Sequence, residues 1–207
     1  MATSSKFAGS VFINCPFDSN YQSLFFALTF AVIDCGFYAR SALEIEDGGE
    51  VRISKIERII DECKFGIHDI SRTELDETHQ LPRFNMPFEL GLFLGAKRFG
   101  NKQQKEKKCL ILDREEYRFA KYISDIAGQD IKGHEDKEDL IIDRVSAFLR
   151  RASDRKTVPG GNAIIARYIA FKEVLPDVLV AAELEKGEMG FSEFSAFAFE
   201  WLDNQLG

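Results

Sequence analysis

Short apolar runs alternate with longer helical patterns over about three quarters of this chain. The runs have the length and the aliphatic or aromatic content of buried strands, and they lie at residues 10–15, 37–43, 65–70, 108–113 and, more briefly, 129–132. The main helical patterns lie at residues 21–35, 51–63, 85–98 and 137–151. This alternation calls for a parallel sheet that helices cover on both faces. We therefore predict an α/β fold, a flavodoxin-like sheet with strand order 2-1-3-4-5 and a C-terminal helical extension.

The pattern changes after residue 153, where charged residues give way to a Pro-Gly-Gly turn at 159–161. Three helical patterns follow, at residues 163–174, 176–186 and 191–206. We predict two parts, an α/β domain at 1–153 and a helical extension at 154–207. The extension is expected to pack on the sheet domain, to form a homo-oligomer or to bind a partner protein.

The charge and the segment types exclude several classes of protein. A net charge of −7 argues against a nucleic-acid binder, and no apolar run is long enough to span a membrane. The first residues lack the hydrophobic segment of a secretion signal, so we expect a cytoplasmic protein. The three histidines and four cysteines show no metal-ligand spacing, and we predict no metal site and reduced thiols.

One carboxylate stands in an unusually apolar setting. Asn85 is a candidate cap for the helix that follows, and Glu89 comes four residues later among Met86, Phe88 and Leu90. A buried carboxylate is either neutralised by a partner or used for chemistry. Stabilisation by the dipole of its own helix is the simpler alternative.

Polar and aromatic residues also follow each predicted strand. The carboxyl ends of parallel strands meet at one edge of a sheet, where such folds bind ligands. The residues expected there are Phe17, Asp18, Arg40, Asp69, Arg72, Asn85 and Glu89. Arginines suit phosphates, and a carboxylate can stabilise an oxocarbenium-like ribosyl centre, so the set suits a nucleotide whose glycosidic bond is cleaved. The simpler structural roles are a helix cap for Asp18, a core position for Phe17 and a mutual ion pair for Asp69 and Arg72.

Three segments, at residues 11–18, 67–72 and 85–91, resemble the bacterial TIR-like proteins and the related nucleoside 2-deoxyribosyltransferase-like families. The resemblance covers roughly residues 10–135. It implies that Glu89, in the segment Glu-Leu-Gly, is the catalytic glutamate and that Asp69, the aspartate at a strand end, is a second catalytic carboxylic acid. It also implies an NAD glycohydrolase or cyclase with NAD as substrate and no cofactor, acting in anti-phage defence.

Two departures from those families matter. Met86 and Pro87 replace the Gly-Thr turn of the transferases, and Cys15 to Asp18 replaces the serine-rich opening loop of TIR proteins. Two alternatives therefore stay open beside the NAD-cleaving enzyme. One is a module that binds a nucleotide signal or a partner without turnover, and the other is a nucleoside 2-deoxyribosyltransferase.

Overall fold

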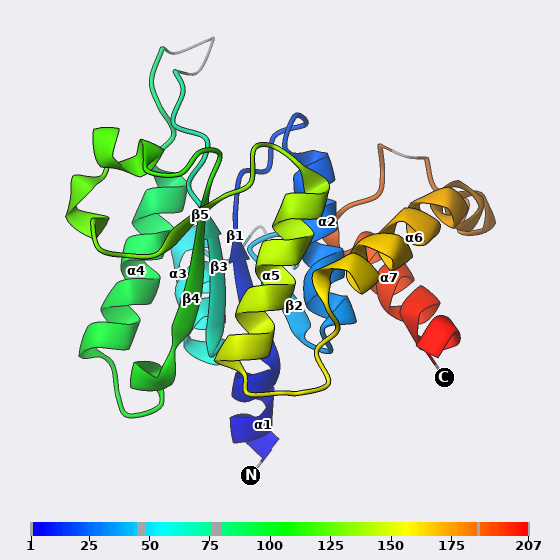
Figure 1. The fold of residues 1–207 in the computed structure, drawn as a ribbon, viewed down its shortest axis with the longest axis horizontal. Helices are drawn as coiled ribbons and strands as arrows, with labels where there is room; N and C mark the ends of the chain where they lie inside the picture. Colours follow the sequence, from blue (N-terminus) through cyan, green and yellow to red (C-terminus); the bar gives the residue numbers. More distant parts are fainter. Residues whose placement is uncertain (1, 45–48, 76–79, 186, 207) are drawn as a thin grey trace.

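The computed structural model describes residues 2–44, 49–75, 80–185 and 187–206. Five strands form one parallel sheet in the order β2-β1-β3-β4-β5, which confirms the predicted α/β fold (Figure 1). The strands are β1 (Ser10–Asn14), β2 (Tyr38–Ser41), β3 (Phe65–Asp69), β4 (Lys108–Asp113) and β5 (Ile131–Gly133).

Helices cover both faces of the sheet because the strands are apolar on both sides. Val11 and Ile13 of β1 face α2 (Gln22–Asp34) and α5 (Glu138–Ala152), whereas Phe12 between them faces α3 (Arg52–Glu62) and α4 (Asn85–Phe99). Buried side chains thus form one core on each face. A smaller core lies beside β5, where Phe119 and Tyr122 pack near Ile131.

Several predicted boundaries differ from the observed ones. The N-terminal helix α1 (Ala2–Gly9) was not expected, because the only large apolar side chain there is Phe7, which is buried against the ammonium of Lys107. β2 is shorter than the predicted range 37–43. Short 3-10 helices also occur, η1 (Gln104–Glu106) before β4, and η2 (Arg118–Lys121) and η3 (Ser124–Ile126) between β4 and β5.

The prediction of separate helices at 163–174 and 176–186 is wrong. A single helix, α6 (Gly161–Ala181), runs through Pro176. Proline inside a helix removes one backbone hydrogen bond and crowds the preceding turn. Buried Phe171 on one side of the proline and Leu179 on the other hold α6 against the core, which offsets that cost.

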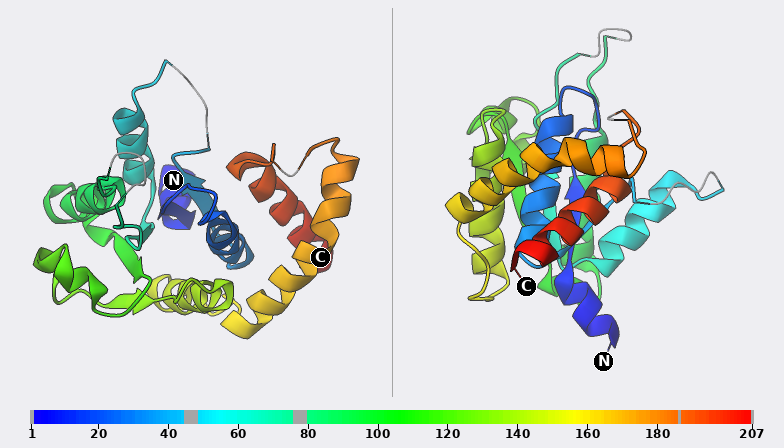
Figure 2. Two further views of the ribbon diagram at one scale, coloured as in Figure 1. Left: turned by 90° about the horizontal axis from the view of Figure 1, so that it is seen from above. Right: turned by 90° about the vertical axis from the view of Figure 1, so that its right-hand side faces the viewer.

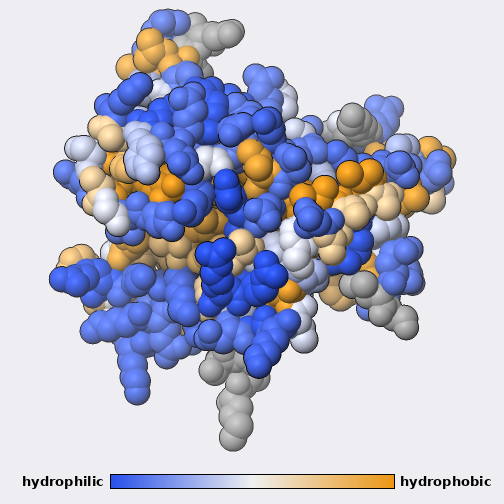
Figure 3. All heavy atoms as spheres, viewed as in Figure 1, coloured by the Kyte–Doolittle hydropathy of each residue, from blue (hydrophilic) through white to orange (hydrophobic). Residues whose placement is uncertain are grey.

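The extension packs on α2 and shares its core. Figure 2 shows α6 and α7 (Phe191–Leu206) on the outer side of α2, away from α3 and α4. The ring of Phe26 in α2 stacks on Phe194 of α7 at 4.2 Å, and Arg167 of α6 donates two hydrogen bonds to the buried carboxylate of Asp34. Apolar side chains remain at the surface along α6 (Figure 3), among them Ile169 and Val180. No helix in the described ranges is both long and apolar enough to cross a membrane.

The Asp34–Arg167 ion pair predicts how firmly α6 is attached. Replacing Arg167 by alanine leaves a buried carboxylate without its partner, so Arg167→Ala is expected to lower the free energy of unfolding by about 3 kcal/mol. The double variant Asp34→Ala/Arg167→Ala is expected to lose less of the free energy of unfolding, because it leaves no unpaired charge buried. Urea denaturation measures both, with exposed Arg98→Ala as the control. If Arg167→Ala were as stable as wild type, the ion pair would not contribute to the attachment of α6.

Candidate functional site

Glu89 lies on the buried side of α4. Met86, Leu90 and Phe93 occupy the same face of the helix at positions i, i+4 and i+7, and Glu89 is only 5% exposed. The helix begins at Asn85, so Glu89 falls in its second turn. Asn85 lies inside the helix and caps nothing, so the predicted cap is wrong. Stabilisation of Glu89 by the dipole of its own helix is therefore not supported, because the free N–H groups at a helix start belong to the first turn.

Asn14, at the end of β1, holds the start of this helix in place. Its side-chain amide donates a hydrogen bond to the Met86 carbonyl at 2.9 Å and another to Nδ1 of His68 at 3.1 Å. Burial lowers the pKa of His68 to about 3, so the ring is neutral and Nδ1 can accept. Sequence analysis missed Asn14. The available signal was a polar residue at the end of an otherwise apolar strand.

A cavity of about 190 Å³ opens beside Glu89 at the carboxyl ends of β1 and β3. Its wall combines the turn after β1, the starts of α3 and α4, and the segment after β3. The lining residues are Asn14, Cys15, Pro16, Phe17, Asp18, Arg52, Arg72, Arg83, Asn85, Met86 and Glu89. Five of the seven residues predicted for the site thus meet here, together with Arg52 and Arg83.

The Glu89 carboxyl has an unusual electrostatic environment. Burial raises its pKa to about 7, and the guanidinium of Arg52 offsets part of that rise. No described residue forms a hydrogen bond or an ion pair with it. A buried carboxyl that titrates near neutral pH without a structural partner is typical of catalytic and ligand-binding sites.

Asp18 and Arg72 face each other at the rim. One oxygen of Asp18 accepts a hydrogen bond from the Tyr21 amide at 3.2 Å, which orders the turn before α2. The N-cap of α2 is Tyr21, so the predicted cap role of Asp18 is wrong. Its other oxygen lies 3.9 Å from Nε of Arg72. That buried Nε has no hydrogen-bond partner among the described residues, which leaves it able to bind an anion. Phe17 packs edge-on against Phe25 at 5.4 Å and also lines the cavity.

Asp69 does not join this cavity, because its side chain faces α2 on the opposite side of the sheet. It accepts hydrogen bonds from the Tyr21 hydroxyl at 2.6 Å and from the Ser71 amide at 2.8 Å, and Nε2 of His134 lies 3.0 Å away. Burial alone would raise the pKa of Asp69, but His134, Ser71 and Tyr21 together lower it. This buried cluster connects β3, α2 and the segment after β5, which is a structural role.

Arg40 also lies outside the cavity. Its guanidinium makes two hydrogen bonds to Glu44 at 2.6 Å and one to Glu62 at 2.8 Å. These two carboxylates accept hydrogen bonds from the guanidinium N–H groups with which Arg40 would otherwise bind a phosphate. The reason is its place on the edge strand β2, where its side chain points toward α3.

Cys15 lies in the cavity wall but is a poor nucleophile. Burial, with the nearby carboxylates of Asp69, Glu89 and Asp18, raises the pKa of its thiol well above the usual value. Over the described part of the chain, no three His, Cys, Asp or Glu side chains gather as a metal site would need. The ionisable groups that line this cavity besides Cys15 are thus one buried carboxyl, a second carboxylate at the rim and three arginines.

The raised pKa of Glu89 predicts a measurable cost in stability. The usual value is 4.5 and the folded value about 7, so the folded protein holds a proton that the unfolded chain has lost between these pH values. Stability therefore falls as pH rises through this window, by about 3 kcal/mol in total. Glu89→Gln is expected to be more stable than wild type at pH 8 by up to that amount, with a much smaller difference at pH 5.

Urea denaturation at both pH values tests this expectation. The matched control is Glu57→Gln, which replaces an exposed glutamate on α3. A stability difference between Glu89→Gln and wild type that does not change with pH would show that Glu89 is ionised without cost.

No family model, curated protein or solved structure matches this chain. The comparisons with known proteins thus assign no function, and the proposal below depends on the geometry of the cavity and on the resemblance of the three sequence segments.

Proposed function

We propose that the protein cleaves the nicotinamide–ribose bond of NAD, as a glycohydrolase or a cyclase. The observation that carries the proposal is the buried Glu89 carboxyl, which has no hydrogen-bond or ion-pair partner among the described residues and lines a cavity at the carboxyl edge of the sheet beside Arg52, Arg72 and Arg83. The same glutamate matches the catalytic residue of the families that the sequence resembles. A place in anti-phage defence is proposed from that resemblance alone.

The reaction needs little acid catalysis. The bond between the ribose C1′ and the pyridinium nitrogen breaks, and its electron pair goes to that nitrogen, so nicotinamide leaves as a neutral molecule. Ionised Glu89 would stabilise the oxocarbenium-like centre left on the ribose. In hydrolysis water attacks C1′ and releases a proton, whereas in cyclisation a nucleophile of the same molecule attacks.

The position of Asp69 favours this reaction over transfer between nucleosides. A nucleoside base usually leaves after it has taken a proton from an acid. Asp69, the predicted second acid, is held by Tyr21 and Ser71 on the other side of the sheet. A leaving group that is already cationic removes the need for that acid.

The size and charge of the cavity fit one end of such a substrate. Pockets for complete drug-sized ligands have volumes of about 300–1,000 Å³. The 190 Å³ beside Glu89 therefore suits the ribose and its leaving base rather than a whole dinucleotide. The arginines at its wall suit the diphosphate, since guanidinium groups bind phosphate oxygens in pairs.

The second candidate is a binding module without turnover. The observation that favours it is that Glu89 has a pKa of about 7, so at neutral pH the Glu89 carboxyl is uncharged in a large fraction of the molecules. In that case the purified protein would bind NAD tightly and release no nicotinamide, even at high protein concentration.

The direct test is to incubate the purified protein with NAD and to quantify free nicotinamide by chromatography. Glu89→Gln keeps the size of the side chain but cannot carry charge, and we expect it to reduce the rate by roughly 100-fold or more. Glu57→Gln is expected to match wild type. Equal release of nicotinamide by wild type and Glu89→Gln would refute this mechanism.

The pH dependence of kcat/KM provides a second test. Because the active form is the carboxylate, the rate should rise with pH and level off above about 7. Arg52 lowers the pKa of Glu89, so Arg52→Ala should move the midpoint to higher pH. Arg98→Ala, an exposed change on α4, serves as the control. A midpoint that stays in place in Arg52→Ala would show that another group controls the rate.

A further inference from the structure

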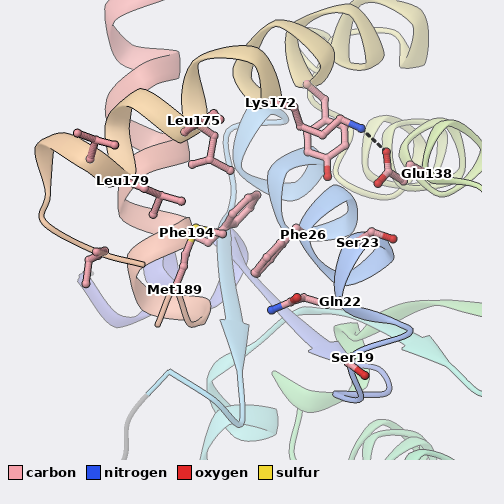
Figure 4. Close-up of a pocket in the computed structure, with 14 residues that line it drawn as sticks. Ser19, Gln22, Ser23, Phe26, Glu138, Lys172, Leu175, Leu179, Met189 and Phe194 are labelled. Carbon is pink, nitrogen blue, oxygen red and sulfur yellow. Dashed lines mark hydrogen bonds and ion pairs between the residues drawn. The ribbon is translucent and has the colours of Figure 1, made fainter. Parts of the chain in front are cut away.

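Two more hollows continue from the Glu89 cavity along α2. The first has a volume of about 290 Å³ and shares Phe17 and Asp18 with the cavity. The second has about 600 Å³ and shares Ser19, Gln22, Phe26 and Met189 with the first (Figure 4). The hollows thus adjoin through shared residues at the turn after β1 and the start of α2. The two larger ones form a groove between α2 and the helical extension, whereas the residues that line the Glu89 cavity all precede the extension.

The groove offers flat aromatic surfaces. Phe191, Phe25, Phe26 and Phe194 form a series of near-parallel rings, with successive centroids at 5.6, 6.0 and 4.2 Å and interplanar angles of 23°, 26° and 7°. Two of these rings come from α2 and two from α7. Phe26 lies inside the series, but it is only partly buried and lines both hollows, so part of its ring can contact a planar ring system of a ligand.

Polar groups without partners lie beside these rings. Ser19 and Gln22 are exposed, and within the described ranges neither side chain makes a hydrogen bond. Figure 4 shows both at the end of the groove nearest the turn after β1. An amide and a hydroxyl beside an aromatic surface can read the edge of a nucleobase, because the amide both donates and accepts hydrogen bonds.

Asp18 lines both the Glu89 cavity and the adjoining 290 Å³ hollow, and Arg72, which faces Asp18, lines the Glu89 cavity. The Nε of Arg72 donates a hydrogen bond to no described residue and can bind a phosphate oxygen, and the carboxylate of Asp18 can accept hydrogen bonds from ribose hydroxyls. The order from the Glu89 cavity into the groove is therefore a ribosyl site at Glu89, an anion site at Arg72, a second ribose position at Asp18 and a base position at Phe26 and Gln22.

The start of α7 forms the outer wall of this base position. Met189, Gly190 and Phe191 line the 290 Å³ hollow, and Ser192 donates a hydrogen bond to the carbonyl of Glu44, just after β2. That contact attaches the wall to the carboxyl edge of the sheet. The extension thus contributes directly to the groove.

We infer that this groove binds the second nucleoside of a dinucleotide substrate, so that the helical extension makes the enzyme selective for dinucleotides over mononucleotides. The inference rests on the proposed function, because it takes the scissile bond to lie at Glu89. Beyond the proposed function, the inference assigns a second binding subsite and a class of substrate, the dinucleotides.

The test compares two substrates with the same scissile bond. NAD carries a second nucleoside and nicotinamide mononucleotide does not, so wild type should have a much higher kcat/KM for NAD. Ser19→Trp fills the groove with a bulky side chain, and Gln22→Ala removes the polar contact. Each should lower the ratio of kcat/KM for NAD to that for the mononucleotide by roughly 10-fold, as expected for the loss of contacts with one base. The matched control, Ser124→Trp, changes an exposed serine of η3 outside the groove.

Equal kcat/KM of wild type for both substrates would overturn the inference, and so would a ratio that stays the same in Ser19→Trp. If neither substrate is cleaved, the proposed function fails and binding of AMP decides the inference by itself. Calorimetry should then show that AMP binds to wild type and to Ser124→Trp roughly 10-fold more tightly than to Ser19→Trp. Equal affinity, or no binding to wild type, would overturn it.

Discussion

The parallel pairing of β1 with β2 on one side and β3 on the other positions every part of the candidate site. Because β1 and β3 run side by side, the turn after β1 lies next to the segment after β3, and Asp18 approaches Arg72. Asn14, at the end of β1, then fixes the start of α4 relative to the sheet through its hydrogen bond to the Met86 carbonyl. Glu89, three residues beyond Met86, is placed at the cavity by that chain of contacts.

The burial of Glu89 costs stability when its carboxyl ionises. Ionising it in the folded protein costs about 3 kcal/mol, which is a large part of the 5–15 kcal/mol that stabilises a typical domain. Asp69 shows the opposite arrangement, since it is fully buried but has three partners. The two carboxyls lie on opposite sides of the same sheet. Of these two carboxyls, Asp69 is occupied by its three partners, whereas Glu89 has no partner among the described residues.

The helical extension is joined to the α/β part by aromatic stacking and by one buried ion pair. The Phe26–Phe194 contact and the Asp34–Arg167 pair both attach it to α2, which is also the helix that begins at the turn carrying Asp18. Residues 154–207 therefore share a core with the sheet and border its ligand edge. The proposed role of the extension in binding a dinucleotide rests on this placement.

From the sequence by itself, the strand order, the two-sided helix cover and the meeting of Phe17, Asp18, Arg72, Asn85 and Glu89 were predictable, because apolar strands alternate with helices and parallel strands end at one edge. The directions of Asp69 and Arg40 were not, because the side to which a side chain turns, and the partners that occupy it, depend on neighbours far away in the sequence. The path of α6 through Pro176 also depended on packing with residues outside its own segment. Only the tertiary structure decided that the extension would line a groove leading to Glu89, since contacts of α7 with α2 and with Glu44 create that wall.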